Sequence, residues 1–184
     1  AVATGLVGVL AVIVAGAIRP RWLQGTVGQG QQLDGFRWLM AALGFATFVL
    51  ILTGAYVTRT EGAPSACTEI PLCGTSVGDM VDIQWIHMTH RGTSLLVGFL
   101  MGVVLVKSIA MQHTGIMVMT GLMAMLLIVQ MGLGIGNVVL RLPNEIRAIH
   151  LAVAMVYFAL TMFLTGSLWR SILTGENVRI GPVK

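Results

Sequence analysis

Charged residues are scarce in this chain. Of its 184 residues only 10% are Asp, Glu, Lys or Arg, against about 25% in an ordinary soluble domain, while 56% are hydrophobic. This shortage of charge excludes a soluble globular domain and a disordered tail, because both depend on charged, solvated side chains. The mean hydropathy of +0.88 also indicates a strongly apolar chain. The sequence therefore predicts an integral membrane protein.

Cysteine and acidic residues are also few. Two cysteines exclude a scaffold built on many disulfides. The basic residues form no cluster that would bind nucleic acid, so the net charge of +4 reflects membrane topology.

Five apolar runs approach the roughly 20 residues that a hydrocarbon core of about 30 Å requires. Because every backbone polar group in lipid needs an internal partner, these runs are expected to be helices. We predict an all-α integral membrane fold with five transmembrane helices, four of which form an antiparallel bundle. The runs are Val2–Ile18, Trp38–Val57, Trp85–Val106, Gly115–Leu140 and Ile146–Trp169.

The lysines and arginines predict how the chain is oriented. One side carries Arg19, Arg21, Arg37, Lys107, Arg170, Arg179 and Lys184, and the positive-inside rule places that side in the cytoplasm. The N-terminus of this chain is then outside a bacterial-type plasma membrane and the C-terminus is cytoplasmic. We divide the chain into a helix and cytoplasmic linker (1–36), the four-helix bundle (37–172) and a cytoplasmic tail (173–184). Since the chain opens inside an apolar run, we expect it to be a segment of a longer protein.

Two histidines occupy matched positions. His90 and His150 each lie about five residues inside an apolar run, and these two runs point the same way. At about 1.5 Å per residue both fall roughly 8 Å below the outer interface. An ionisable side chain in hydrocarbon is costly, and imidazoles from two facing helices can hold a heme iron between them. We predict heme ligation by this pair; the alternative is that each ring only hydrogen-bonds a neighbouring carbonyl.

The other two histidines receive different interpretations. His87 lies three residues before His90 on roughly the same face and one turn nearer water. It is an alternative ligand, but we expect it to contact a heme propionate or water at the mouth of the site. His113 lies in a short cytoplasmic loop, where we expect a solvated surface residue.

Three arginines at the outer ends of the helices suit the heme propionates, because the guanidinium fork matches a carboxylate. Arg91 follows His90, Arg147 precedes His150 by three residues, and Arg59 ends the second apolar run. The alternative is that each is an interfacial arginine that extends its charge to water.

Small residues offer room for a ring, although the same spacing is common in plain helix packing. They are Gly54, Ala55, Gly132, Gly134 and Gly136.

The cysteines lie in the longest outer loop, Thr58–Gln84. Outside the cytoplasm Cys67 and Cys73 can oxidise to a disulfide, which would stabilise the short loop by about 2–3 kcal/mol. Two unpaired thiols are the alternative. A metal site is disfavoured because no further Cys or His in that loop completes a ligand set.

Several of these segments together resemble the heme A synthase family, and in particular its C-terminal half. They are Thr53-Gly-Ala-Tyr-Val-Thr-Arg59, the Cys67-x5-Cys73 loop with Pro71-Leu72 before the second cysteine, His90-Arg91, and Arg147-Ala-Ile-His150. The resemblance implies two fused four-helix bundles, each with a cysteine loop and a histidine pair. Helices two to five here would be the second bundle, which holds a permanent heme b, and Val2–Ile18 would end the first.

The resemblance also implies an activity and a departure from it. The family converts heme O to heme A for terminal oxidases, using a glutamate three residues before a histidine of the first bundle. This chain has His87 at the matching position, and none of its seven acidic residues lies within a helix core. Substrate oxidation by this chain alone is therefore not expected.

Two functional classes follow. The first is an oxidoreductase of heme A biosynthesis, represented by its C-terminal half. The second is a non-catalytic heme b subunit, acting as an electron relay or scaffold in a larger respiratory or photosynthetic membrane complex. The expected partners are heme, membrane lipid and either heme O synthase, terminal oxidase assembly factors or such a complex, without nucleic acid.

Overall fold

The computed structural model describes residues 2–18, 30–62, 66, 67, 69, 72, 73, 80–139 and 144–173, and its regular elements there are all helices. They are α1 (Val2–Ala17), α2 (Gly30–Arg59), α3 (Asp82–Ala110), α4 (Thr114–Val139) and α5 (Asn144–Leu173). Helices α2 to α5 are long and apolar enough to cross a membrane, and α1 is a shorter apolar helix. The predicted all-α membrane fold is confirmed, with one helix at each apolar run.

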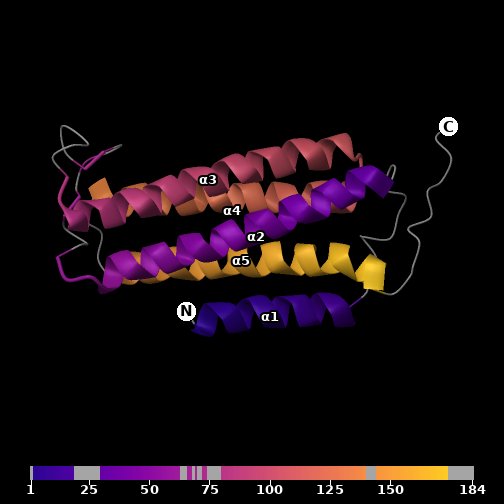
Figure 1. Ribbon diagram of the computed structural model, residues 1–184, viewed down its shortest axis with the longest axis horizontal. Coiled ribbons are helices and arrows are strands. Elements are labelled where there is room, and N and C mark those ends of the chain that lie inside the picture. The colour runs from indigo at the N-terminus through magenta and orange to yellow at the C-terminus, as the bar shows by residue number, and fades with distance from the viewer. Residues whose placement is uncertain are drawn as a thin grey trace.

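Helices α2 to α5 alternate in direction and form a ring of neighbours (Figure 1). Helix α2 packs against α3 and α5, and α4 packs against the same two helices. Consequently α3 and α5 run in the same direction on one diagonal of the bundle, as in other antiparallel four-helix bundles. Helix α1 lies outside this ring along α5.

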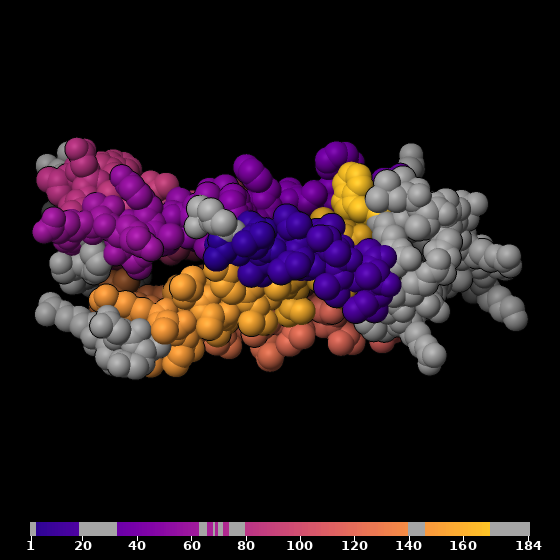
Figure 2. Space-filling model, turned by 90° about the horizontal axis from the view of Figure 1, so that it is seen from below, coloured from indigo at the N-terminus to yellow at the C-terminus, as the bar shows by residue number. Residues whose placement is uncertain are grey.

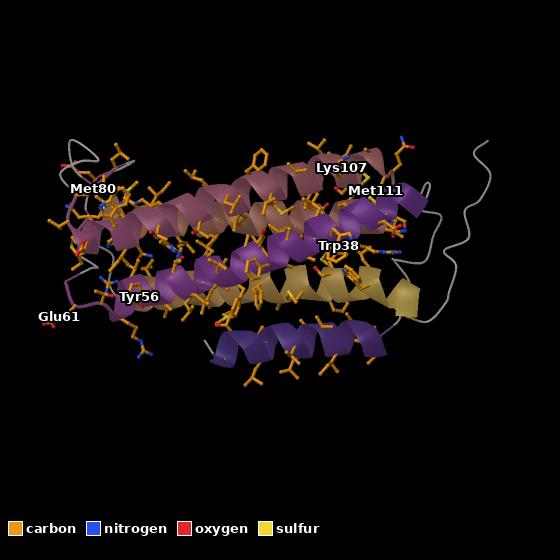
Figure 3. The ribbon with its side chains drawn as sticks, in the orientation of Figure 1. Trp38, Tyr56, Glu61, Met80, Lys107 and Met111 are labelled. Atoms are coloured by element: carbon orange, nitrogen blue, oxygen red, sulfur yellow. A yellow bond between two sulfur atoms is a disulfide. The ribbon has the colours of Figure 1, made fainter. Side chains whose placement is uncertain are left out.

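The two ends of the bundle differ. We call the end where α2 and α4 finish and α3 and α5 begin the histidine end. In Figure 3, Tyr56, Glu61 and Met80 mark the histidine end, while Lys107 and Met111 mark the opposite end.

The apolar core fills the middle of the bundle and the end opposite the histidine end. On α2 its last member is Ala46, on α3 its first is Val97, on α4 its last is Leu127, and on α5 its first is Tyr157. On each of these helices the core therefore stops before it reaches the histidine end. The members are Leu33, Phe36, Met40, Leu43, Ala46, Val97, Met101, Val104, Met111, Ile116, Met123, Leu127, Tyr157, Leu164 and Leu168.

Hydroxyl groups and a tryptophan pair join helices within and beside this core. Ser108 on α3 and Thr120 on α4 are fully buried with their hydroxyl oxygens 2.8 Å apart. Trp38 and Trp169 meet edge to face with ring centroids 4.9 Å apart, near the opposite end, as is common for tryptophan at a membrane interface. A hydrogen bond between transmembrane helices, such as that between Ser108 and Thr120, contributes about 0.6 kcal/mol to stability.

His113 corrects one sequence-based expectation. It is buried rather than solvated, with 7% of its surface exposed, and it directly precedes α4. The backbone N–H of Ile116 donates to His113 Nδ1 at 3.4 Å. The imidazole therefore takes the place of an N-cap acceptor, a role that usually belongs to Ser, Thr, Asp or Asn.

Many large apolar side chains point outward, among them Phe45, Leu95, Phe99, Val118 and Ile128. In a multi-pass membrane protein that surface faces lipid. The domain boundaries after residues 36 and 172 and the sidedness stay predictions. Of the seven basic residues used to predict the sidedness, Arg19, Arg21, Arg179 and Lys184 lie outside the described residues.

Candidate functional site

The interior of the bundle at the histidine end is not filled by the apolar core. Figure 2 shows a hollow between α2 and α5 at this end, beside the loop that follows α2. The two predicted ligands lie on the diagonal helices at this level. His90 lies eight residues into α3 and His150 six residues into α5, roughly 12 Å and 9 Å along the helix axes.

His90 is held by α2. Its Nδ1 lies 3.2 Å from Thr53 Oγ1, and the Thr53 hydroxyl donates its own hydrogen to Leu50 O at 2.9 Å. Because that hydrogen is already used, Thr53 Oγ1 acts as the acceptor and His90 Nδ1 carries the proton. The lone pair of His90 Nε2 is then available to a metal.

His150 is held by α4. Its Nε2 lies 3.2 Å from the side-chain nitrogen of Gln130, while its Nδ1 is buried and has no hydrogen-bond partner in the described part of the chain. Buried polar atoms are nearly always hydrogen-bonded, so this imidazole nitrogen needs a partner that the described residues do not supply.

A glycine lies against each ring. A Cβ placed on Gly54 would lie 2.9 Å from His90 Cε1, and one on Gly134 would lie 3.3 Å from His150 Cε1. Each histidine is therefore held in the same way, by a polar side chain and a glycine of the adjacent antiparallel helix. His90 and His150 also lie close enough to interact electrostatically. Each imidazole thus lies in the bundle beside a polar side chain of the neighbouring helix. Histidine is the residue type that most often binds heme iron in proteins.

The remaining predicted residues surround this pair at different depths. His87 is buried, with 7% exposed, and lies within electrostatic range of His90. Arg59 and Arg147 are exposed at the histidine end, and Arg91 is partly buried. The roles of these residues stay predictions.

The cysteine loop is attached to the start of α3. Cys67 and Cys73 are joined by a disulfide, and both are buried. Gln84 Nε2 donates to Ala66 O at 3.4 Å, and Arg91 Nη1 donates to Glu69 O at 2.7 Å. Arg91 thus binds the loop with one arm of its guanidinium, directly after the candidate ligand His90.

The roles of three polar residues were not predicted from the sequence, and these residues are Thr53, Gln130 and Asn137. Gln130 and Asn137 lie seven residues apart, on one face of α4, and each has a buried side-chain oxygen without a partner in the described residues. A signal for them was present, because an uncharged amide inside a transmembrane run is costly and usually faces other helices or a ligand.

Among the described residues no group of three or more His, Cys, Asp and Glu side chains could hold a metal ion by itself. A metal at this site would therefore need a further ligand set, which the four nitrogens of a porphyrin supply. The end of the apolar cluster before this level, the unpaired His150 nitrogen and the two glycines are compatible with such a flat macrocycle.

Comparison with known proteins is consistent with this site. The family COX15-CtaA, described as cytochrome oxidase assembly protein, matches residues 1–162. The heme A synthase of Bacillus licheniformis is 38% identical over 52 residues, which are 27% of this chain and 17% of that relative. The match therefore covers only a small part of that relative's length.

Proposed function

Since the chain belongs to the COX15-CtaA family of cytochrome oxidase assembly proteins, we propose that it is a heme-binding membrane oxidoreductase related to heme A synthase. In this proposal one heme b lies between α3 and α5 at the histidine end, ligated by His90 and His150. The bundle from 37 to 172 corresponds to the C-terminal half of such an enzyme, and 1–36 ends the preceding bundle.

The observation that supports this most directly is the pair of imidazoles on diagonal helices. Each ring has one nitrogen beside a polar side chain of the neighbouring helix, Thr53 for His90 and Gln130 for His150. Partners of this kind fix the orientation of metal-binding histidines. When bound, a heme with two imidazole ligands accepts and releases one electron at a time.

The residues of the chain define what this half of the protein does. His90 and His150 would bind and orient the ring. The disulfide and the hydrogen bonds from Arg91 and Gln84 fix Ala66, Cys67, Glu69 and Cys73 beside the first turns of α3. Arg91, Arg147 and Arg59 are placed at the histidine end, where propionates would emerge, and His87 lies one turn nearer that end than His90. We assign these four residues to propionate or water contacts at the mouth of the site.

The acidic residues favour an electron-transfer role over substrate oxidation in this part of the protein. Asp34 is the fifth residue of α2, at the end opposite the histidine end, and Asp82 and Glu145 lie in the first turns of α3 and α5. Glu61 and Glu69 lie outside the helices, and Asp79 and Glu176 are not among the described residues. Among the described side chains the hydrogen-bond partners of the two imidazoles are Thr53 and Gln130, and no carboxylate is paired with either ring to act as an acid or base. The same observation supports the second candidate, a non-catalytic heme b subunit that relays electrons or acts as a scaffold in a larger membrane complex.

The proposal also includes sidedness and partners. The histidine end faces the outside of a bacterial-type inner membrane, with α1 starting outside and the C-terminus in the cytoplasm. The protein would then bind its partners within the membrane, either heme O synthase, terminal oxidase assembly factors or a larger complex.

The test is the heme spectrum of the purified chain. We expect a low-spin heme in the wild type, identified as heme b by the pyridine hemochrome method, and its loss in His90→Ala and His150→Ala. His87→Ala and His113→Asn are the matched controls and should keep the spectrum, since asparagine retains an N-cap acceptor at position 113. A wild-type chain without heme, or an unchanged low-spin spectrum in His150→Ala, would disprove the ligand assignment.

A further inference from the structure

The two candidate ligands have different neighbours at their second nitrogen. His90 Nδ1 faces the hydroxyl oxygen of Thr53, which is already an acceptor because its hydrogen is bonded to Leu50 O. His150 Nε2 faces the side-chain nitrogen of Gln130 at 3.2 Å. An amide nitrogen donates and cannot accept.

Gln130 can supply the hydrogen-bond acceptor that the His150 ring needs once it binds a metal. A neutral imidazole that gives one lone pair to a metal keeps its proton on the other nitrogen, and that N–H needs an acceptor. Gln130 Oε1 is buried without a partner in the described part of the chain. A half-turn of the side-chain amide exchanges its nitrogen and oxygen, so that Oε1 accepts the His150 N–H and both groups gain a partner.

We propose that Gln130 is a positioning residue of the site: its amide oxygen accepts the ring N–H of His150 and tunes the electron affinity of the bound iron. This inference rests on the proposed function. A hydrogen-bonded N–H makes imidazole a more basic ligand, and a more basic ligand stabilises ferric iron over ferrous iron. Gln130 would therefore lower the reduction potential of a heme held by His150, and Thr53 would act in the same way through His90.

The structure offers a matched control on α2. Thr47 is a buried threonine seven residues before Gly54, and its hydroxyl donates to Leu43 O at 2.7 Å. Among the described residues, no hydrogen bond joins Thr47 to either imidazole. Thr47→Val therefore repeats the chemistry of Thr53→Val on the same helix and away from the candidate ligands.

The experiment combines heme content with redox titration of the full chain in detergent or lipid. Gln130→Met keeps length and volume but loses the acceptor. We expect it to retain heme, to favour reduction about tenfold more than the wild type, equivalent to about 59 mV for a one-electron couple, and to alter the g values of the ferric heme. Thr53→Val should shift the potential in the same direction, Thr47→Val should not shift it, and Gln130→Glu, which keeps an acceptor, should stay at or below the wild-type value.

The outcomes separate this inference from the proposed function. If the wild-type chain binds no heme, both the proposed function and the role of Gln130 are wrong. Heme in the wild type, with an unchanged potential and unchanged g values in Gln130→Met, overturns the role of Gln130 alone. If Gln130→Met loses heme, retention in Gln130→Glu supports the acceptor role and loss in both variants overturns it.

Discussion

The sharpest prediction concerns Gly54, which lies against the His90 ring. A Cβ at this position would be 2.9 Å from His90 Cε1 and 3.3 Å from Nδ1, whereas ordinary contact begins at 3.4 Å. In Gly54→Ala the ring must therefore move by about 0.5 Å, more than the roughly 0.2 Å within which metal–ligand distances vary. Displacement also disturbs the contact with Thr53, and loss of such support typically costs 10–100-fold in metal affinity.

Heme titration and absorption spectra of a graded glycine series measure the effect. Gly134→Ala needs a shift of only about 0.1 Å, since its Cβ would lie 3.3 Å from His150 Cε1, so its loss of heme should be much smaller. Gly92→Ala and Gly132→Ala meet nothing within 4 Å and should keep wild-type affinity. Because alanine is the better helix former by about 1 kcal/mol, a loss at position 54 cannot come from a weaker helix.

The prediction can be refuted by the order in which the glycine-to-alanine variants lose heme affinity. Wild-type heme affinity and an unchanged spectrum in Gly54→Ala would show that the His90 ring does not have to stay where the structure places it. Equal losses in Gly54→Ala and Gly132→Ala would point to a general packing defect instead.

Three further results are expected. In membranes without reductant, Cys67 and Cys73 should stay unlabelled by a thiol reagent and become labelled after reduction, because they form a disulfide. Arg91→Ala removes a 2.7 Å charged hydrogen bond to the loop backbone, so limited proteolysis of the cysteine loop should be several-fold faster. Ser108→Ala breaks the buried contact with Thr120 and should reduce stability by about 0.6 kcal/mol, measured as a lower Tm.

Each of these results has a control or a contradicting outcome. Labelling of both cysteines before reduction would contradict the disulfide, and an unchanged rate of loop cleavage in Arg91→Ala would contradict the anchoring of the loop. Ser94→Ala is matched to Ser108→Ala, because the Ser94 hydroxyl donates only to Arg91 O of its own helix among the described contacts. Equal destabilisation by both serine variants would show that the contact between α3 and α4 contributes nothing.

The membrane fold could be predicted because its cause is visible in a single chain. Long apolar runs must be helical in lipid, and successive membrane-crossing helices alternate in direction. The ends were less predictable: α3 starts at Asp82, three residues before the apolar run, because a helix continues through its polar first turn. Val81 N donates to Gln84 Oε1 at 3.2 Å there, a contact that hydropathy does not register.

The site could be predicted only in part. His90 and His150 are conspicuous because ionisable groups are rare in such runs, and Gly54 and Gly134 because small residues permit close approach. Gln130 was missed because a single amide carries no charge, and its importance depends on which helix face meets α5. His113 was misjudged because an imidazole at a helix start can be buried as a cap, which loop position alone does not reveal.

The place of α1 outside the ring has a mechanical consequence. Helix α5 is supported by α1, α2 and α4, and a Cβ on Gly166 would lie 3.1 Å from Ala15 Cβ, whereas α3 is supported by α2 and α4. The span with His150 therefore packs against three of the described helices, and the span with His90 packs against two. We expect α5 to be the more restrained of the two spans, because it has one more packing partner.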